Sequence, residues 1–200
     1  MASAMDQIVV RRLCRVTSCG GGLGARSAVR GSPINRGAPP RAHHPDTLDA
    51  VSELALMLHD QGKLAEAEPL FRRALEGRER QLGAQHPSTL LSVNNLALLL
   101  QAQGKLAEAE LFRRALEGYE QQLGAQHPST LTAVNNLAGL FQAQGKLAEA
   151  EPLYRRALEG CERQLGAQHL STLSSVNNLA ALLMGQGKLA EAEPLFRRAL

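Results

Sequence analysis

The sequence contains no tryptophan, and aromatic residues make up only 3% of its 200 residues. Three cysteines are too few for the disulfide framework of a small secreted domain. No run of 18 apolar residues occurs, so hydropathy predicts no transmembrane helix. The apolar fraction of 44% is nevertheless too high for a chain that is disordered throughout. Few aromatic residues beside abundant Leu and Ala favour a helical protein.

Charge is divided unevenly along the chain, although the formal net charge is only +3. Residues 1–42 hold seven arginines, no lysine and one acidic residue, which makes this segment +6. Residues 43–200 hold 15 basic and 18 acidic residues, a net charge of −3. The basicity of the protein therefore belongs to its N-terminal segment alone.

The segment 1–42 is predicted to be a disordered tail rich in Arg, Gly and Pro. Within it, residues 8–16 are the one stretch able to form a short basic amphipathic helix. An Arg-rich, acid-poor N-terminus suits an organellar transit peptide for mitochondrion or plastid. The alternatives are a leader without function and an arm that contacts nucleic acid or membrane. Without a targeting signal, we expect a cytoplasmic protein.

The rest of the chain is an internal repeat. The motif His44-Pro45-Asp46-Thr47-Leu48 recurs in closely related form at residues 86–90, 127–131 and 169–173, with spacings of 42, 41 and 42. Gly-Lys-Leu-Ala-Glu-Ala-Glu follows each time, starting at residues 62, 104, 145 and 187. Residues 43–200 thus form an array of repeats, at about 44–85, 86–126, 127–168 and 169–200, the last of them truncated.

Each repeat predicts two helices. Leu90, Val93, Ala97 and Leu100 show the spacing of three and four that marks one face of a first helix, which ends at Gln103-Gly104. A second apolar pattern, from Leu64 to Leu75, is also helical. One such pair cannot bury its apolar stripe alone, whereas stacked pairs bury a continuous core.

The repeat resembles the tetratricopeptide repeat (TPR), in the 42-residue form of kinesin light chains. Its signature of apolar, small and aromatic residues is matched at seven offsets in several copies; the third copy gives Val134, Leu137, Ala138, Phe141, Ala150, Tyr154 and Ala157. The resemblance implies an all-α, right-handed solenoid of stacked antiparallel helix pairs. It also implies a non-catalytic scaffold that binds proteins. The alternative is a TPR fragment of a larger signalling or motor-associated protein.

The repeats depart from the family pattern in three ways. The second copy lacks one residue before Phe112, so the helix start or the preceding turn must absorb a rotation of about 100°, or Phe112 leaves the core. Glycines at 77, 118 and 160 should each cost about 1 kcal/mol relative to Ala in a helix. Prolines at 69, 152 and 194 should bend the first turns of the second helices.

The last copy stops within its second helix. Leu195, Phe196 and Leu200 are therefore expected to be partly exposed. The chain is then either a fragment or truncated gene model, or it associates with itself through this uncapped end.

The motifs that could serve catalysis, metal binding or cofactor binding are all weak, and we predict no enzyme, metal or cofactor. Gly20 to Ala25 match a dinucleotide-binding pattern by chance, because no clear strand precedes them and no acid lies at 40–45. The histidines 44, 86, 127 and 169 are about one helix-packing distance apart, too far to share an ion, and are interpreted as turn residues. Cys14, Cys19 and Cys161 are interpreted as free thiols. Glu66, Glu68, Glu149 and Glu151 are interpreted as a solvated polar face.

The resemblance implies that the first helices line a concave groove for a peptide. The matching residues are Ser52, Asn94, Asn95, Gln101, Asn135, Asn136, Gln142, Asn177 and Asn178. Asparagine amides both donate and accept, so a row of them suits an extended peptide backbone. The alternative is that these asparagines only stabilise the stacking of repeats.

The predicted partner is a protein or peptide that the sequence does not identify. No first helix carries Lys or Arg. Co-chaperone repeats clamp a terminal carboxylate with such residues, and kinesin light chains use them against acidic motifs, so neither ligand class is expected here. A nucleic-acid partner is expected only through the tail.

Overall fold

The computed structural model describes residues 44–105 and 109–199 of the chain. These ranges belong to a unit of residues 42–200. The predictions for the tail lie outside the described residues, namely its disorder, the helix at 8–16, the glycine match and the cysteines 14 and 19. The predicted exposure of Leu200 lies outside them too.

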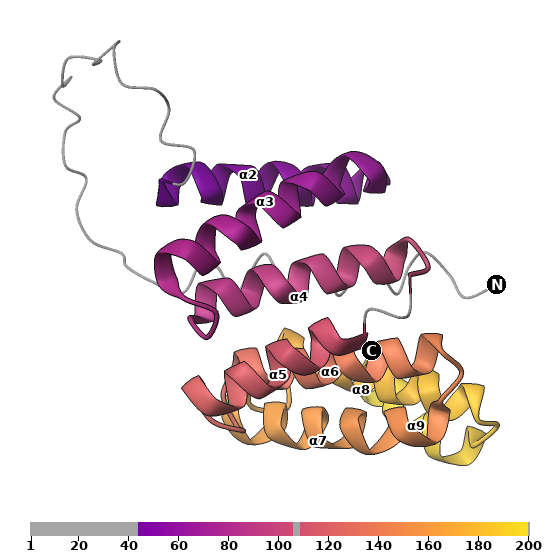
Figure 1. Cartoon of the computed structure of the whole chain (residues 1–200). Coiled ribbons are helices and arrows are strands. Elements are labelled where there is room, and N and C mark those ends of the chain that lie inside the picture. Colours follow the sequence, from indigo (N-terminus) through magenta and orange to yellow (C-terminus); the bar gives the residue numbers. More distant parts are fainter. Residues whose placement is uncertain (1–43, 106–108, 200) are drawn as a thin grey trace, which may run out of the picture. The chain divides into compact units, whose positions relative to one another are not determined.

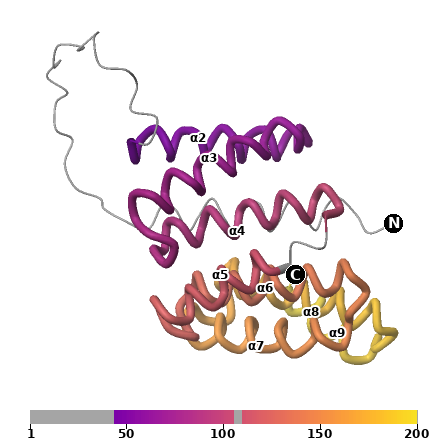
Figure 2. The backbone as a smooth tube through the Cα atoms, viewed as in Figure 1, coloured from indigo at the N-terminus to yellow at the C-terminus, as the bar shows by residue number. Residues whose placement is uncertain are grey.

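The described residues form eight α-helices and no strand (Figure 1). The first helices of the four repeats are α2 (Pro45–Asp60), α4 (Pro87–Ala102), α6 (Pro128–Ala143) and α8 (Leu170–Gly185). The second helices are α3 (Leu64–Leu82), α5 (Ala109–Leu123), α7 (Leu147–Leu165) and α9 (Leu189–Ala199). Each packs chiefly on the helices before and after it in the chain, and the backbone reverses between α2 and α3 (Figure 2). The predicted all-α solenoid of helix pairs is confirmed.

The histidines are caps of the first helices. The Nδ1 atoms of His86, His127 and His169 accept hydrogen bonds from backbone N–H groups two residues on, at 3.2, 3.2 and 3.1 Å. These bonds satisfy one of the N–H groups that a helix start leaves without a partner. Their interpretation as turn residues is confirmed, although His44 lacks this bond and lies beside Asp46 instead.

The glycines inside the second helices make room for a leucine, which the sequence analysis missed. A Cβ atom added to Gly77, Gly118 or Gly160 would lie 2.8 Å from a Cδ1 atom of Leu48, Leu90 or Leu131, respectively. Each of these leucines is at most 1% exposed and belongs to the first helix of the same repeat. The helix-propensity cost is therefore offset by a close approach between the two helices of a pair.

The one-residue deletion in the second copy does not remove Phe112 from the core. Phe112 is 1% exposed, and Ala115, Leu116 and Tyr119 are also buried on the same face of α5. From Phe112 onward, α5 therefore buries the same face as the other second helices. Helices α3, α7 and α9 run without interruption through their prolines.

Ion pairs join successive second helices. Arg114 lies 2.5 Å from Glu79, Arg156 lies 2.5 Å from Glu120, and Arg198 pairs with Glu162. The two members of each pair occupy the same two positions in successive repeats. The stacking register of the array is therefore marked by charge as well as by apolar contact.

A second set of ion pairs corrects the interpretation of Glu68 and Glu151 as solvated. Their side chains are only 20% and 18% exposed, and they lie 3.0 and 2.7 Å from Lys105 and Lys188 of the following repeat. These ammonium groups, with further hydrogen bonds from nearby Arg and Gln side chains, hold the pKa of both carboxyl groups at about 2.

A continuous apolar core runs through the repeats, from Ala55 to Ala192. At its end, Leu195 and Phe196 are only half-buried, as predicted. None of the helices in the two described ranges has the length and apolar character needed to cross a membrane.

Candidate functional site

The asparagines of the first helices pair between repeats. Asn136 Nδ2 donates to Asn94 Oδ1 at 3.1 Å, and Asn178 Nδ2 donates to Asn135 Oδ1 at 3.2 Å. In both cases the second asparagine of one repeat reaches the first asparagine of the repeat before. These four side chains therefore stabilise stacking, which was the alternative interpretation of the row.

In each bond the accepting asparagine uses only its side-chain oxygen, which leaves its side-chain N–H groups available. The side-chain N–H groups of Asn94 and Asn135 donate to no residue within 44–105 or 109–199. Asn94 is buried at 3% exposure, whereas Asn135 is half-buried. Asn177, at the equivalent position in α8, is also half-buried and makes no side-chain hydrogen bond to a described residue. Asn135 and Asn177 thus present donors on the surface of the first helices.

The other predicted groove residues divide into two groups. Ser52 Oγ donates to Leu48 O at 2.9 Å, and Gln142 Oε1 accepts from Tyr154 Oη at 2.9 Å. Asn95 is buried and Gln101 is half-buried, and neither side chain bonds to another described residue. Binding of a peptide by these residues stays a prediction.

A buried arginine next to Ser52 was missed by the sequence analysis. Arg78 of α3 is 8% exposed, and its Nη1 atom donates to Ser52 Oγ at 3.0 Å and to Ser92 Oγ at 2.6 Å. Its Nη2 atom lies 2.5 Å from Asp49 Oδ1, so the guanidinium charge is balanced locally. The signal in the sequence was the change at this position among near-identical repeats, to Tyr119 and Cys161.

The surface is not uniform in charge. Helix α2 carries Asp46, Asp49, Glu53 and Asp60, whereas α4, α6 and α8 carry no acidic residue. Glu53 stands at the position of the second asparagine in the other repeats, and its side chain is exposed. The groove predicted to be neutral is therefore negative at its N-terminal end.

The remaining chemical groups are structural. Cys161 is buried, and Ser175 Oγ donates to its Sγ atom at 3.8 Å. Burial raises the pKa of the Cys161 thiol, which disfavours the nucleophilic thiolate. In the ranges that the structure describes, no three His, Cys, Asp or Glu side chains gather in a way that could hold a metal ion.

Comparison with known families gives a match along the repeats. The family model for the tetratricopeptide repeat matches residues 46–112, 110–160 and 129–200. No curated protein is significantly similar to the chain.

Solved structures of repeat proteins are also similar to this chain in fold and in sequence. A Podosopora anserina protein assigned as a kinesin light chain, with nearly identical TPR-like repeats, is 31% identical, with a TM-score of 0.64 over 80% of this chain and 76% of that one. A point variant of it is 29% identical, with a TM-score of 0.67 and the same coverage. BtubC (BKLC) from P. vanneervenii is 26% identical, with a TM-score of 0.68 over 98% of this chain and 70% of that one.

Proposed function

Because the chain belongs to the tetratricopeptide repeat family, in its kinesin-light-chain-like form, we propose that it is a non-catalytic scaffold that holds a peptide of a partner protein. The peptide lies along the first helices. The supporting observation is the row of amide donors at Asn135 and Asn177 that bond to no described residue. Backbone carbonyl groups of an extended peptide need such donors when they leave water.

The charges of the first helices set the chemistry of the peptide. None of them supplies a Lys or Arg, and Arg78, which reaches them from α3, is paired with Asp49. A terminal carboxylate or an acidic motif would therefore lose hydration without gaining a cationic partner. Glu53, exposed on α2 at the N-terminal end of the first helices, favours a basic residue near one end of an otherwise uncharged peptide.

A displayed library of random peptides tests this function with the full chain as bait. We expect selected peptides to carry one Lys or Arg and few acidic residues. Asn135→Ala and Asn177→Ala should each weaken their binding about 2- to 10-fold, the worth of one neutral hydrogen bond. Asn177→Ala is the sharper variant, because Asn177 bonds to no described side chain and its loss leaves stacking intact.

The matched control is Gln164→Ala, which removes an exposed amide from the second helix α7. It should leave peptide affinity unchanged. Equal affinity of the wild type and both asparagine variants for every selected peptide would show that the peptide does not bind along these asparagines. Glu53→Gln should reduce the preference for a basic residue without abolishing binding.

A further inference from the structure

Each contact between successive repeats joins a second helix to a first helix. The second helix of one repeat packs on the first helix of the next, in the pairs α3–α4, α5–α6 and α7–α8. At two of these junctions a lysine just before the next second helix reaches back to a glutamate, in the pairs Lys105–Glu68 and Lys188–Glu151. At the same two junctions Gln103 and Gln186 donate to the carbonyl oxygens of Leu64 and Leu147.

Within the described residues, no helix packs on the matching half of this contact on α2. Leu54 and Met57 of α2 are 48% and 56% exposed. Their counterparts in α4, Leu96 and Leu99, are 2% and 0% exposed beneath α3. Lys63, at the position of Lys105 and Lys188, forms no ion pair with a described residue. Leu54, Met57 and Lys63 make up what we call the α2 end face.

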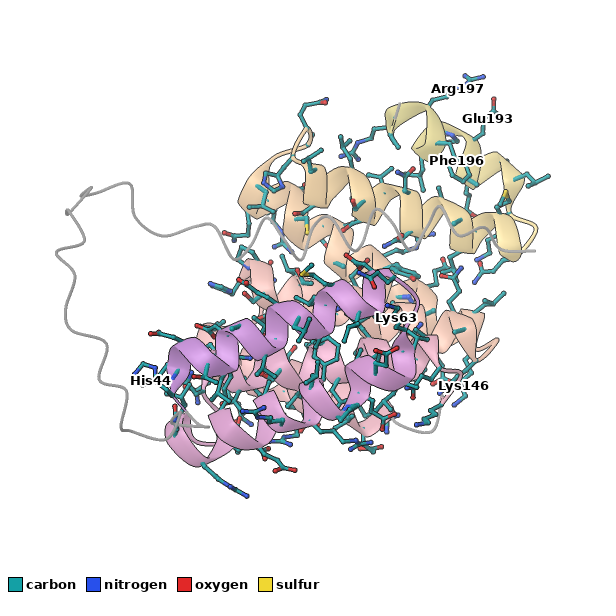
Figure 3. The ribbon with its side chains drawn as sticks, turned by 90° about the horizontal axis from the view of Figure 1, so that it is seen from above. His44, Lys63, Lys146, Glu193, Phe196 and Arg197 are labelled. Atoms are coloured by element: carbon teal, nitrogen blue, oxygen red, sulfur yellow. The ribbon has the colours of Figure 1, made fainter. Side chains whose placement is uncertain are left out.

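Helix α9 leaves the other half uncovered. Leu189 is 64% exposed, and Phe196 is half-buried where Phe71, Phe112 and Tyr154 are almost fully buried. The side chain of Glu193, at the position of Glu68 and Glu151, is 63% exposed. Glu193 and Phe196 lie close together on α9 (Figure 3). Leu189, Glu193 and Phe196 make up the α9 end face.

We propose that the two end faces bind each other between copies of this chain, head to tail. Residues 189–199 of α9 are identical in sequence to residues 64–74 of α3, and α3 already covers α4 within the chain. A helix of this sequence is therefore known to fit a first helix of this array. In the proposed contact, Leu189 and Phe196 of one copy cover Leu54 and Met57 of the next.

Side chains of opposite charge also meet across the proposed contact. Glu193 of one copy meets Lys63 of the next, as Glu68 meets Lys105 within the chain. Gln61, the counterpart of Gln103 and Gln186, meets the carbonyl oxygen of Leu189.

The contact joins two different faces, so it does not close on itself as a symmetric dimer would. Copies should add one after another, and the mass should keep rising with concentration beyond twice the 21.5 kDa monomer. This inference does not depend on peptide binding by the first helices. Failure of either proposal leaves the other in place.

Sedimentation velocity on the full chain, from micromolar to millimolar concentration, tests the proposal. Met57→Glu blocks the α2 end face and Leu189→Glu blocks the α9 end face; both side chains are more than half exposed, so the fold is kept. Each variant alone should stay monomeric. Their equimolar mixture should form a dimer and stop there, because each copy then retains one working face.

Leu170→Glu is the control, since Leu170 is 63% exposed on α8 and lies outside both end faces. It should associate like the wild type. Lys63→Glu and Glu193→Lys should each weaken association about fivefold or more, and the double variant should recover most of it. A wild type that stays monomeric at millimolar concentration overturns the proposal. So does a mixture of the two blocked variants that fails to dimerise.

Discussion

One buried position changes its residue from repeat to repeat while its surroundings stay almost constant. Arg78, Tyr119 and Cys161 are 8%, 5% and 5% exposed and lie where a second helix meets first helices. Arg78 bonds to Ser52 and Ser92, Tyr119 Oη donates to the carbonyl oxygen of Pro87, and Cys161 accepts from Ser175. Because each residue has its own polar contact, the junctions are not interchangeable although the repeats are nearly identical.

Replacing Arg78 with alanine should lower the free energy of unfolding by about 1–3 kcal/mol, since the buried side chain donates to two hydroxyl groups and pairs with Asp49. Urea denaturation followed by circular dichroism measures this. The control, Arg80→Ala, removes an exposed arginine that faces Glu76 one turn away and should cost less than about 0.5 kcal/mol. Equal losses in the two variants would contradict a structural role for Arg78.

Gly160→Ala should destabilise the protein by about 1–3 kcal/mol, although helix propensity alone predicts a gain. The new methyl group would overlap Leu131, which is 1% exposed and surrounded by the core. Gly139→Ala is the control, because the nearest atom is Tyr154 Oη at 3.4 Å and α8 already has Ala181 at the same position. It should stabilise by up to about 1 kcal/mol. A stabilising Gly160→Ala, by thermal or urea unfolding, would refute the close-approach explanation.

At the scale of the element, the one-residue deletion in the second copy changes a junction rather than the fold. Glu68 and Glu151 each lie three residues before a buried aromatic, and the second copy has an alanine at that place. Lys146, the counterpart of Lys105 and Lys188, instead has its Nζ atom 5.7 Å from the centre of the Phe141 ring. The lysine is exposed at the turn before α7 (Figure 3). Among the described residues, the junction between the second and third repeats therefore lacks the Lys–Glu pair of the other two.

This difference predicts a pH dependence for Lys188→Met. The pKa of Glu151 is lowered from 4.5 to about 2, chiefly by Lys188, so the folded state favours the ionised carboxylate. The pair therefore stabilises the protein above pH 4.5 and loses its effect as the pH falls towards 2. At neutral pH, Lys188→Met should cost about 0.5–1 kcal/mol in urea unfolding, and the cost should vanish near pH 2.

Lys146→Met is the matched control, because Lys146 forms no ion pair with a carboxylate of the described residues. Its effect on the free energy of unfolding should be small and independent of pH between 2 and 4.5. The same cost of Lys188→Met at both ends of this range would show that the lysine acts through its aliphatic stem alone.

Features set by local pattern could be predicted from the sequence, whereas contacts between helices could not. Helix pairs, the histidine turns and the exposure of Phe196 follow from local pattern and spacing. The bond from Asn136 to Asn94 joins residues 42 apart, and the bond from Arg78 to Ser92 joins the first repeat to the second. To find them, one must know how the helices stack as well as which residues each helix contains. This is why the sequence marked the asparagine row but not its internal pairing.

At the scale of the whole molecule, a linear array unfolds as one unit only while each junction is strong enough to couple its neighbours. The junction between the second and third repeats has no Lys–Glu pair in the part of the chain that the structure describes, and it is held by the Asn136–Asn94 and Arg156–Glu120 contacts. Asn136→Ala should therefore lower the urea m-value and separate the unfolding of residues 44–126 from that of 127–199, as hydrogen exchange would resolve. Asn178→Ala, at the next junction, keeps the Lys188–Glu151 pair and should lower the midpoint with the m-value unchanged. An unchanged m-value in Asn136→Ala would show that apolar packing alone couples the repeats.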